Sequence, residues 1–219
     1  MVFRPEFLAL IAGRRAALRK ELDGLLPAAG PIVWEIGCGH GHFLARYAAE
    51  NPGRLCFGVD ISGPRIERAR RKVSRARLPN CHFLQAEARE FLNALPAKVT
   101  LDETWVLFPD PWPKKRHHKN RILQPAFLEA LAGHAPAGAR LYFRTDHAGY
   151  HAAVAEGARP LRTWRLEPDA PWPLEHETVF QALADHFYSL VAVRTSHPAR
   201  PIETIAPGLP PPAAPMSPA

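Results

Sequence analysis

The stretch Ile32-Val-Trp-Glu-Ile-Gly-Cys-Gly-His-Gly41 decides the fold class. Its first half is an apolar run typical of a buried strand, and its second half places a glycine at every other position. Glycine adopts positive φ freely and lets the backbone approach a ligand closely. We therefore expect a strand over 32–37 and a helix over 41–50, joined by a tight ligand-binding turn that Glu35 precedes by two positions.

Apolar runs and helical patterns alternate downstream of this turn. We predict strands over 55–60, 81–86, 103–108, 139–145, 163–166 and 187–194, and helices over 64–76, 89–95, 125–132 and 147–156. Strands separated by helices indicate a parallel sheet that is covered on both faces. The predicted fold is α/β: a doubly wound, Rossmann-like, mostly parallel seven-stranded sheet that binds its ligand at the carboxyl ends of the strands.

Two segments flank the α/β domain predicted over 31–197. Within 1–30, apolar residues recur at helical spacing with arginines and a lysine between them, which predicts a basic amphipathic helix over 5–26. Residues 198–219 contain eight prolines and no periodicity. This composition predicts a polyproline-like, disordered tail.

The charge balance points to a polyanionic partner. The 219 residues include 28 Lys and Arg against 21 Asp and Glu, so the net charge is +7 and the isoelectric point is about 9.7. No apolar stretch is long enough for a membrane span, and the first residues lack the features of a signal peptide. Cys38, Cys56 and Cys81 are odd in number and widely spaced, as expected of reduced thiols in a cytoplasmic protein.

The glycine turn differs from two familiar phosphate-binding motifs. Its spacing is Gly-x-Gly-x-Gly, whereas the dinucleotide fingerprint is Gly-x-Gly-x-x-Gly, and it lacks the Gly-Lys-Ser/Thr of the P-loop. The Glu35 carboxylate would repel a pyrophosphate but suits the sulfonium and ammonium groups of S-adenosylmethionine. A strand–helix turn with no ligand is the alternative.

Two further acids follow the next predicted strands. Asp60 ends the second strand, where an acid either accepts hydrogen bonds from ribose hydroxyls or caps the next helix. Glu87-Ala88 follows the third strand, where an adenine would lie, although Glu87 could equally be a solvated loop acid. The alternation of Cys38, His40 and His42 matches no standard zinc spacing, so we expect no metal site.

A proline-rich loop after the fourth predicted strand presents an acid beside a basic run. In Phe108-Pro-Asp-Pro-Trp-Pro113, three prolines stiffen the chain around Asp110, as a positioned catalytic acid requires. Five of the next eight residues, Lys114 to Arg121, are Lys or Arg. Such a run is often only a solvated surface, but its place beside the loop favours phosphate docking.

The stretch from Phe108 to Arg121 resembles the hallmark of the tRNA (guanine-N7-)-methyltransferases. Glu35–Gly41 and Arg144–Asp146 match the same family in order and spacing, and the resemblance covers about residues 30–195. It implies a class I methyltransferase fold and transfer of a methyl group from S-adenosylmethionine to a guanine in the tRNA variable loop. The resemblance implies tRNA as the partner, and together with the composition we expect a cytoplasmic protein, a monomer or homodimer, that binds no membrane.

The resemblance assigns roles to particular positions. The cofactor would be bound by Glu35, Gly37, Gly39, Gly41, Asp60, Glu87, Ala88 and Asp110, and Asp110 would also be catalytic. The substrate would be held by Lys114, Asp146, Thr178 and Gln181. The RNA would be contacted by Lys115, Arg116, Lys119 and Arg121. The last motif departs from the family pattern Thr-x-Phe/Tyr-Glu, because Gln181 replaces the charged residue. For Asp146, a helix N-cap is the alternative.

Two other functions compete with this one. An amino-group methyltransferase typically carries Asp-Pro-Pro-aromatic, whereas here one proline separates Asp110 from Trp112 and a basic run follows. A non-catalytic RNA-binding protein on the same scaffold would not need Glu35, Asp60 and Asp110 together.

Overall fold

A computed structural model of the chain describes residues 5–174 and 185–199. The strands are β1 Gly30–Ile36, β2 Cys56–Asp60, β3 Cys81–Gln85, β4 Val99–Leu107, β5 Arg140–Thr145, β6 Trp164–Leu166 and β7 Tyr188–Arg194. The helices are α1 Pro5–Asp23, α2 His42–Glu50, α3 Gly63–Ala76, α4 Ala88–Ala94, α5 Pro125–His134 and α6 Ala148–Ala158, with a 3₁₀ helix η1 at Lys115–Asn120. Every predicted strand and helix is present; η1 was not predicted.

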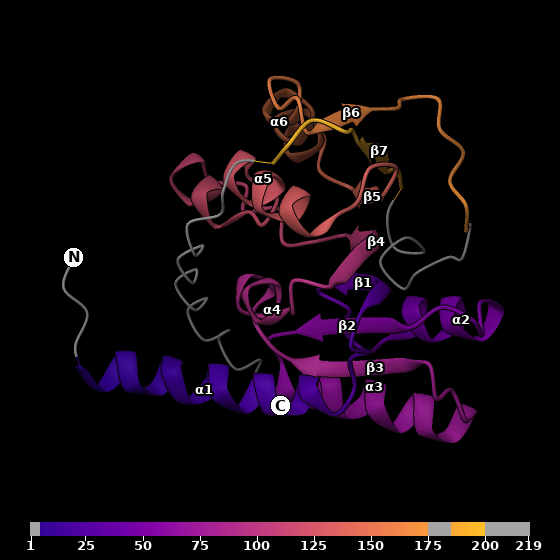
Figure 1. The fold of residues 1–219 in the computed structure, drawn as a ribbon. Coiled ribbons are helices and arrows are strands. Elements are labelled where there is room, and N and C mark those ends of the chain that lie inside the picture. Colours follow the sequence, from indigo (N-terminus) through magenta and orange to yellow (C-terminus); the bar gives the residue numbers. More distant parts are fainter. Residues whose placement is uncertain (1–4, 175–184, 200–219) are drawn as a thin grey trace.

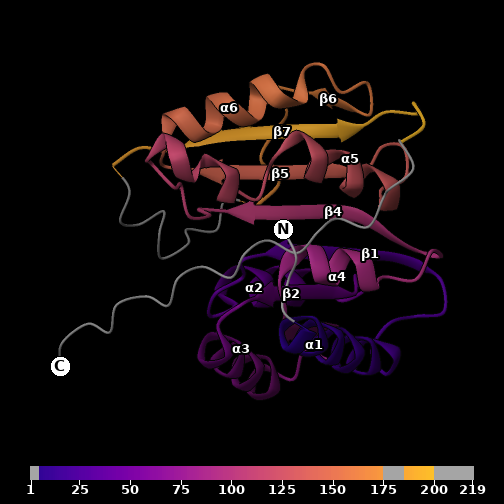
Figure 2. The same ribbon diagram turned by 90° about the vertical axis from the view of Figure 1, so that its left-hand side faces the viewer.

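The seven strands form one sheet in the order β3-β2-β1-β4-β5-β7-β6. Strands β1 to β5 are parallel to one another, whereas β7 pairs antiparallel with both β5 and β6. Figure 2 shows β7 running against β4. The predicted doubly wound sheet is confirmed, and it is mixed because β7 is inserted between β5 and β6. The strand order reverses between β1 and β4, and the carboxyl ends of the strands at such a point are where open α/β sheets bind their ligands.

Helices cover both faces of the sheet (Figure 1). On one face, α1, α4, α5 and α6 share a hydrophobic core with Trp34 of β1, which stacks on Phe91 with 4.9 Å between ring centroids. On the other face, α2 and α3 pack against Trp105 of β4, which stacks on Tyr142 at 4.0 Å. The two tryptophans lie on neighbouring strands and face opposite layers, so the central sheet is fixed from both sides.

The N-terminal helix belongs to the same core. Leu18 and Leu22 of α1 are 6% and 1% exposed and join the layer that contains α4. None of the helices that the structure describes is long and apolar enough to cross a lipid bilayer. Cys38, Cys56 and Cys81 are buried and form no disulfide, which agrees with the predicted reduced thiols.

Candidate functional site

The candidate site lies where β1, β2, β4 and β5 end, at the edge marked by the arrowhead of β4 in Figure 2. Glu35 is the second-last residue of β1, and Asp60 is the last residue of β2. Asp110 and Asp146 follow β4 and β5. Because parallel strands end at one edge, the fold brings four acids from distant parts of the sequence to this edge.

The glycine turn has the geometry that the sequence predicts. Gly37, Gly39 and Gly41 have φ of 71°, 53° and 65°, in the left-handed region that glycine tolerates. A Cβ at Gly41 would lie 2.4 Å from the Phe83 ring, so Gly41 is needed for packing. A Cβ at Gly37 or Gly39 would meet no atom of the described part of the chain within 4 Å. The first two glycines therefore leave open space above the turn.

The Asp60 carboxylate joins this turn to the loop after β2 through two hydrogen bonds. Its Oδ2 accepts a hydrogen bond from the Gly39 N–H at 3.0 Å, and its Oδ1 accepts one from the Ser62 N–H at 2.8 Å. The residue at the N-cap of α3 is Ser62. The alternative that Asp60 caps this helix is therefore wrong, and its 6% exposed carboxylate instead joins two loops of the site.

Glu35 is a buried acid with an unused oxygen. It is 4% exposed, and its Oε2 has no hydrogen-bond partner among the described residues. The pKa of Glu35 is raised to about 8, chiefly by burial. A backbone hydrogen bond at Leu44 and the charge of Lys72 lower this pKa, and the nearby Asp60 raises it. A buried carboxyl in this condition is stabilised by a cation that enters the site. The site therefore fits the charge of the predicted cofactor.

Glu87 performs a structural task at the start of α4. Its Oε2 accepts hydrogen bonds from the N–H groups of Arg89 and Glu90, at 2.8 and 3.2 Å, and its Oε1 pairs with Arg89 Nη1 at 2.8 Å. It is thus the N-cap of α4, and the solvated-acid alternative is wrong. Contact of Glu87 and of the buried Ala88 with an adenine stays a prediction.

The proline-rich loop is strained and held at both ends. Phe108 and Trp112 have φ of 48° and 44°, although neither is glycine. The Phe108 N–H donates to the Arg144 carbonyl at 2.8 Å, and Arg121 Nε donates to the Pro111 carbonyl at 2.8 Å. Asp110 lies exposed between these two anchors. The loop therefore presents the predicted catalytic acid to the solvent side of the site.

The predicted RNA contact of Arg121 is wrong. Its side chain is 2% exposed, lies 4.7 Å from the centroid of the Tyr150 ring and donates to the Pro111 carbonyl. The guanidinium therefore supports the loop from inside. The neighbouring Lys114, Lys115, Arg116 and Lys119 are exposed in and before η1, and their contacts with substrate and RNA stay predictions.

Asp146 is not a helix cap. The N-cap of α6 is His147, whose Nδ1 accepts a hydrogen bond from the Tyr150 N–H at 3.0 Å. Asp146 is exposed and has no hydrogen-bond or ion-pair partner among the described residues, so its carboxylate is available to a substrate. Thr178 and Gln181 lie outside the described residues.

Sequence reasoning gave no separate role to Arg144. The guanidinium lies between the rings of Trp172 and Phe187, at 4.0 and 4.4 Å from their centroids, and Nε donates to Ser189 Oγ at 2.9 Å. The residue is 3% exposed at the end of β5. The available signal was an arginine directly after the apolar run Leu141–Phe143, but its aromatic partners come from distant parts of the chain.

Comparisons with known proteins show the family to which the chain belongs. A family model described as "Putative methyltransferase" matches residues 29–182. Among curated proteins, a tRNA (guanine-N(7)-)-methyltransferase of Thermus thermophilus is 37% identical over 69% of this chain and 49% of its own length. One from Treponema pallidum is 38% identical over 74% of this chain and 66% of its own length. The chain thus spans about half to two thirds of these relatives.

Solved structures agree on the fold. An rRNA methylase from Streptococcus thermophilus has a TM-score of 0.53 at 13% identity, over 89% of this chain and 99% of that one. TrmN from Thermus thermophilus has a TM-score of 0.56 at 19% identity, over 82% of this chain and 48% of that one. At such identities the likeness concerns the fold alone, and it confirms the predicted Rossmann-like methyltransferase fold.

The burial of Glu35 predicts an unusual dependence of stability on pH. Its pKa is about 8 in the folded protein against 4.5 as the ordinary value. Between these values the native state binds more protons than the unfolded state, so the free energy of unfolding falls as pH rises. Glu35→Gln should remove this fall and make the protein more stable than the wild type at pH 8.5, by on the order of a few kcal/mol.

Urea denaturation at pH 5 and 8.5 measures this effect. The control is Glu67→Gln, which makes the same change on the exposed face of α3. If the free energy of unfolding changed with pH in the same way in the wild type and in Glu35→Gln, the raised pKa of Glu35 would be contradicted.

The interior position of Arg121 predicts a loss of stability when it is truncated. Arg121→Ala removes a hydrogen bond to the Pro111 carbonyl and a ring contact, and should lower the free energy of unfolding by about 2–3 kcal/mol. Lys119→Ala, two residues away and exposed, should change it by less than about 0.5 kcal/mol. Equal denaturation midpoints for the two variants would contradict a buried, supporting role for the Arg121 side chain.

Proposed function

The chain belongs to the methyltransferase family whose model matches residues 29–182, and on this premise we propose that it transfers a methyl group from S-adenosylmethionine to N7 of a guanine in the tRNA variable loop. Membership of a methyltransferase family agrees with the methyltransferase activity that the motifs predict, and the curated relatives at 37% and 38% identity support the narrower resemblance to tRNA (guanine-N7-)-methyltransferases. The observation that carries the proposal is the buried, incompletely paired carboxyl of Glu35 beneath an open glycine turn, at the same edge as Asp110.

The cofactor would be held by the acids of β1 and β2. Glu35 Oε2 is the buried acceptor for the positive charge of the methionine part. Each oxygen of Asp60 already accepts one backbone hydrogen bond and retains a second lone pair for a ribose hydroxyl. S-adenosylmethionine supplies an electrophilic methyl group on a sulfonium centre. Gly37 and Gly39 keep the space above the turn free of side chains.

The substrate side requires positioning rather than a strong base. Guanine N7 has an exposed lone pair and no proton to remove, so methyl transfer is an in-line displacement that depends on alignment. Guanine N1 and N2 are hydrogen-bond donors that suit the exposed carboxylates of Asp110 and Asp146. The product carries a positive charge on the purine, and a fixed carboxylate stabilises this charge as it develops.

The RNA backbone would dock on the basic surface around η1. Lys114, Lys115, Arg116 and Lys119 are exposed directly after the Asp110 loop. Their charge suits phosphates next to the reacting base. N7 lies in the deep major groove of RNA, so the target base must unstack locally. The buried, unpaired thiols support a reducing, cytoplasmic setting for this reaction.

Because Asp110 is exposed, its substitution should lower activity without changing the stability of the fold. Asp110→Asn should lower methyl transfer at least about 100-fold, because the carboxylate that stabilises the purine charge is lost. Stability should not change, and affinity for S-adenosylmethionine should fall modestly at most. The control is Asp102→Asn, which makes the same change near the other end of β4.

A labelled-methyl assay on bulk unmodified tRNA measures the rate, and borohydride–aniline cleavage maps N7-methylguanine. Full activity of Asp110→Asn would remove Asp110 from the mechanism. Cleavage outside the variable loop would change the proposed target.

A further inference from the structure

Helix α3 carries far more positive charge than its packing requires. From Gly63 to its C-cap Arg77 it contains seven Lys or Arg residues and a single acid, Glu67. Arg68, Arg71 and Arg75 recur at i, i+3 and i+7 and are exposed, opposite the buried side of the helix, which consists of Ile66, Ala69 and Val73. We call Arg68, Arg71 and Arg75 the α3 arginine row.

We propose that the α3 arginine row is a second RNA-binding surface, which holds tRNA phosphates outside the methylated loop. This proposal rests on the proposed function, because it takes tRNA as the substrate. It adds a surface to the one around η1, on a different helix and at the β3 side of the sheet.

The fold does not need the row. Arg71 forms an exposed pair with Glu67 at 3.4 Å, Arg68 lies 3.5 Å from a ring nitrogen of His40, and Arg75 has no partner among the described residues. Exposed contacts of this kind contribute little to stability. Arg70 on the same helix differs, because it donates to the Phe83 carbonyl at 2.7 Å and pairs with Glu21. Like charges at helical spacing repel one another, and a bound polyanion removes that repulsion.

The row begins at the candidate site. Arg65, in the first turn of α3, lies 3.9 Å from Asp60, and Arg68 lies beside His40 of the glycine turn. From Arg68 to Arg75 the row extends about 10 Å along the helix axis, away from the site. Along one strand of a B-form duplex the phosphates are about 3.4 Å apart along the axis, so a strand segment of about three phosphates can meet all three arginines.

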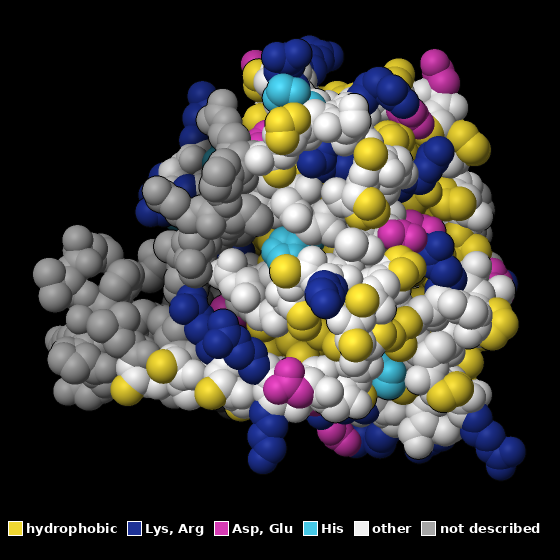
Figure 3. Space-filling view, viewed as in Figure 1, with side chains coloured by type: hydrophobic (Ala, Val, Ile, Leu, Met, Phe, Trp, Pro, Cys, Tyr) yellow, Lys and Arg dark blue, Asp and Glu magenta, His cyan; other side chains and the backbone are white. Residues whose placement is uncertain are grey.

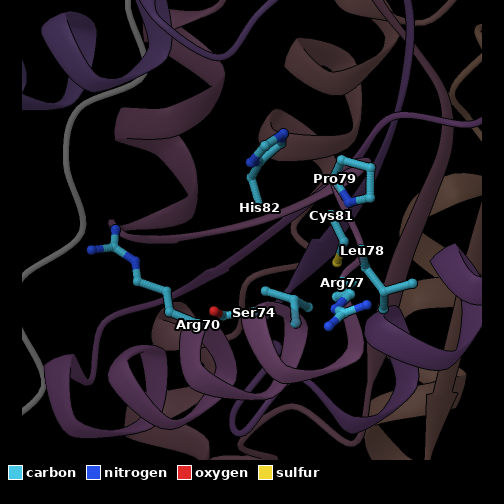
Figure 4. A pocket seen from close by; sticks show the side chains of 8 residues that line it. Arg70, Ser74, Arg77, Leu78, Pro79, Cys81 and His82 are labelled. Atoms are coloured by element: carbon cyan, nitrogen blue, oxygen red, sulfur yellow. The ribbon is translucent and has the colours of Figure 1, made fainter.

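A hollow of about 430 Å³ lies beside the row, between α3 and the start of β3. Figure 4 shows Arg70 at one end of it and Arg77 with Leu78 at the other, with His82 on the β3 side. Arg77 is exposed and carries the basic surface past the end of the helix. In Figure 3, Lys and Arg side chains project along the lower edge, where Figure 1 places α1 and α3.

The chemistry of the surface favours RNA over a membrane. Arginine presents a planar fork of donors that matches phosphate oxygens. Binding to a lipid surface also needs apolar side chains that enter the acyl region. Among the described residues the large exposed hydrophobics are Ile61 and Phe187, and neither lies on α3.

The test compares two triple variants of equal charge. Arg68→Gln/Arg71→Gln/Arg75→Gln neutralises the row, and Arg159→Gln/Arg162→Gln/Arg165→Gln neutralises three exposed arginines around the end of α6 and β6. We expect the row variant to bind bulk unmodified tRNA about ten-fold more weakly. The negative slope of log affinity against log salt concentration should become shallower by about two to three. The control should keep the wild-type slope.

Further measurements separate this proposal from the proposed function. Titration with S-adenosylmethionine and methylation at saturating tRNA should be nearly unchanged in the row variant, because none of the three arginines is among the residues proposed to hold the cofactor or the guanine. Equal tRNA affinity and slope in both triple variants would overturn the second surface while leaving the methyltransferase proposal intact. A row variant that loses binding to phosphatidylserine vesicles but not to tRNA would also overturn it. A wild type that binds tRNA through the row without methylating it would contradict only the proposed function.

Discussion

Asp60 accepts hydrogen bonds from the backbone N–H groups of Gly39 and Ser62, and this bridge joins the turn after β1 to the loop after β2. Glu35 lies two positions before this turn, and its buried carboxyl has one oxygen without a hydrogen-bond partner among the described residues. Burying an acid in this way is unfavourable and raises its pKa to about 8. A cation bound in the site would stabilise this buried carboxylate. The acids that follow β4 and β5 lie at the same edge of the sheet.

The structure gives the charged residues two different tasks. Glu87, Arg121 and Arg144 are committed to the protein itself: one caps a helix, one supports the proline-rich loop, and one lies between two aromatic rings. Asp110 and Asp146 have no such duties among the described residues. This division separates residues that shape the site from residues that are free to act in it. The proposed chemistry depends on the second group.

Most of the fold could be predicted because strand and helix periods are local properties of the chain. The acids of the site could also be predicted, since each follows a predicted strand and parallel strands end together. The duties of Arg121 and Glu87 could not, because burial and capping depend on neighbours such as Tyr150 and on where the helix begins. The antiparallel course of β7 likewise depends on its insertion between two other strands.

The most direct test of this account is the number of protons released when S-adenosylmethionine binds, measured by calorimetry in buffers of different ionisation enthalpy. With a Glu35 pKa of about 8, the free site is mostly protonated at pH 7 and the cation-bound site is not. We expect release of about one proton at pH 7, falling towards zero at pH 9, and no release with Glu35→Gln. Binding without proton release at pH 7, or unchanged binding by Glu35→Gln, would contradict it.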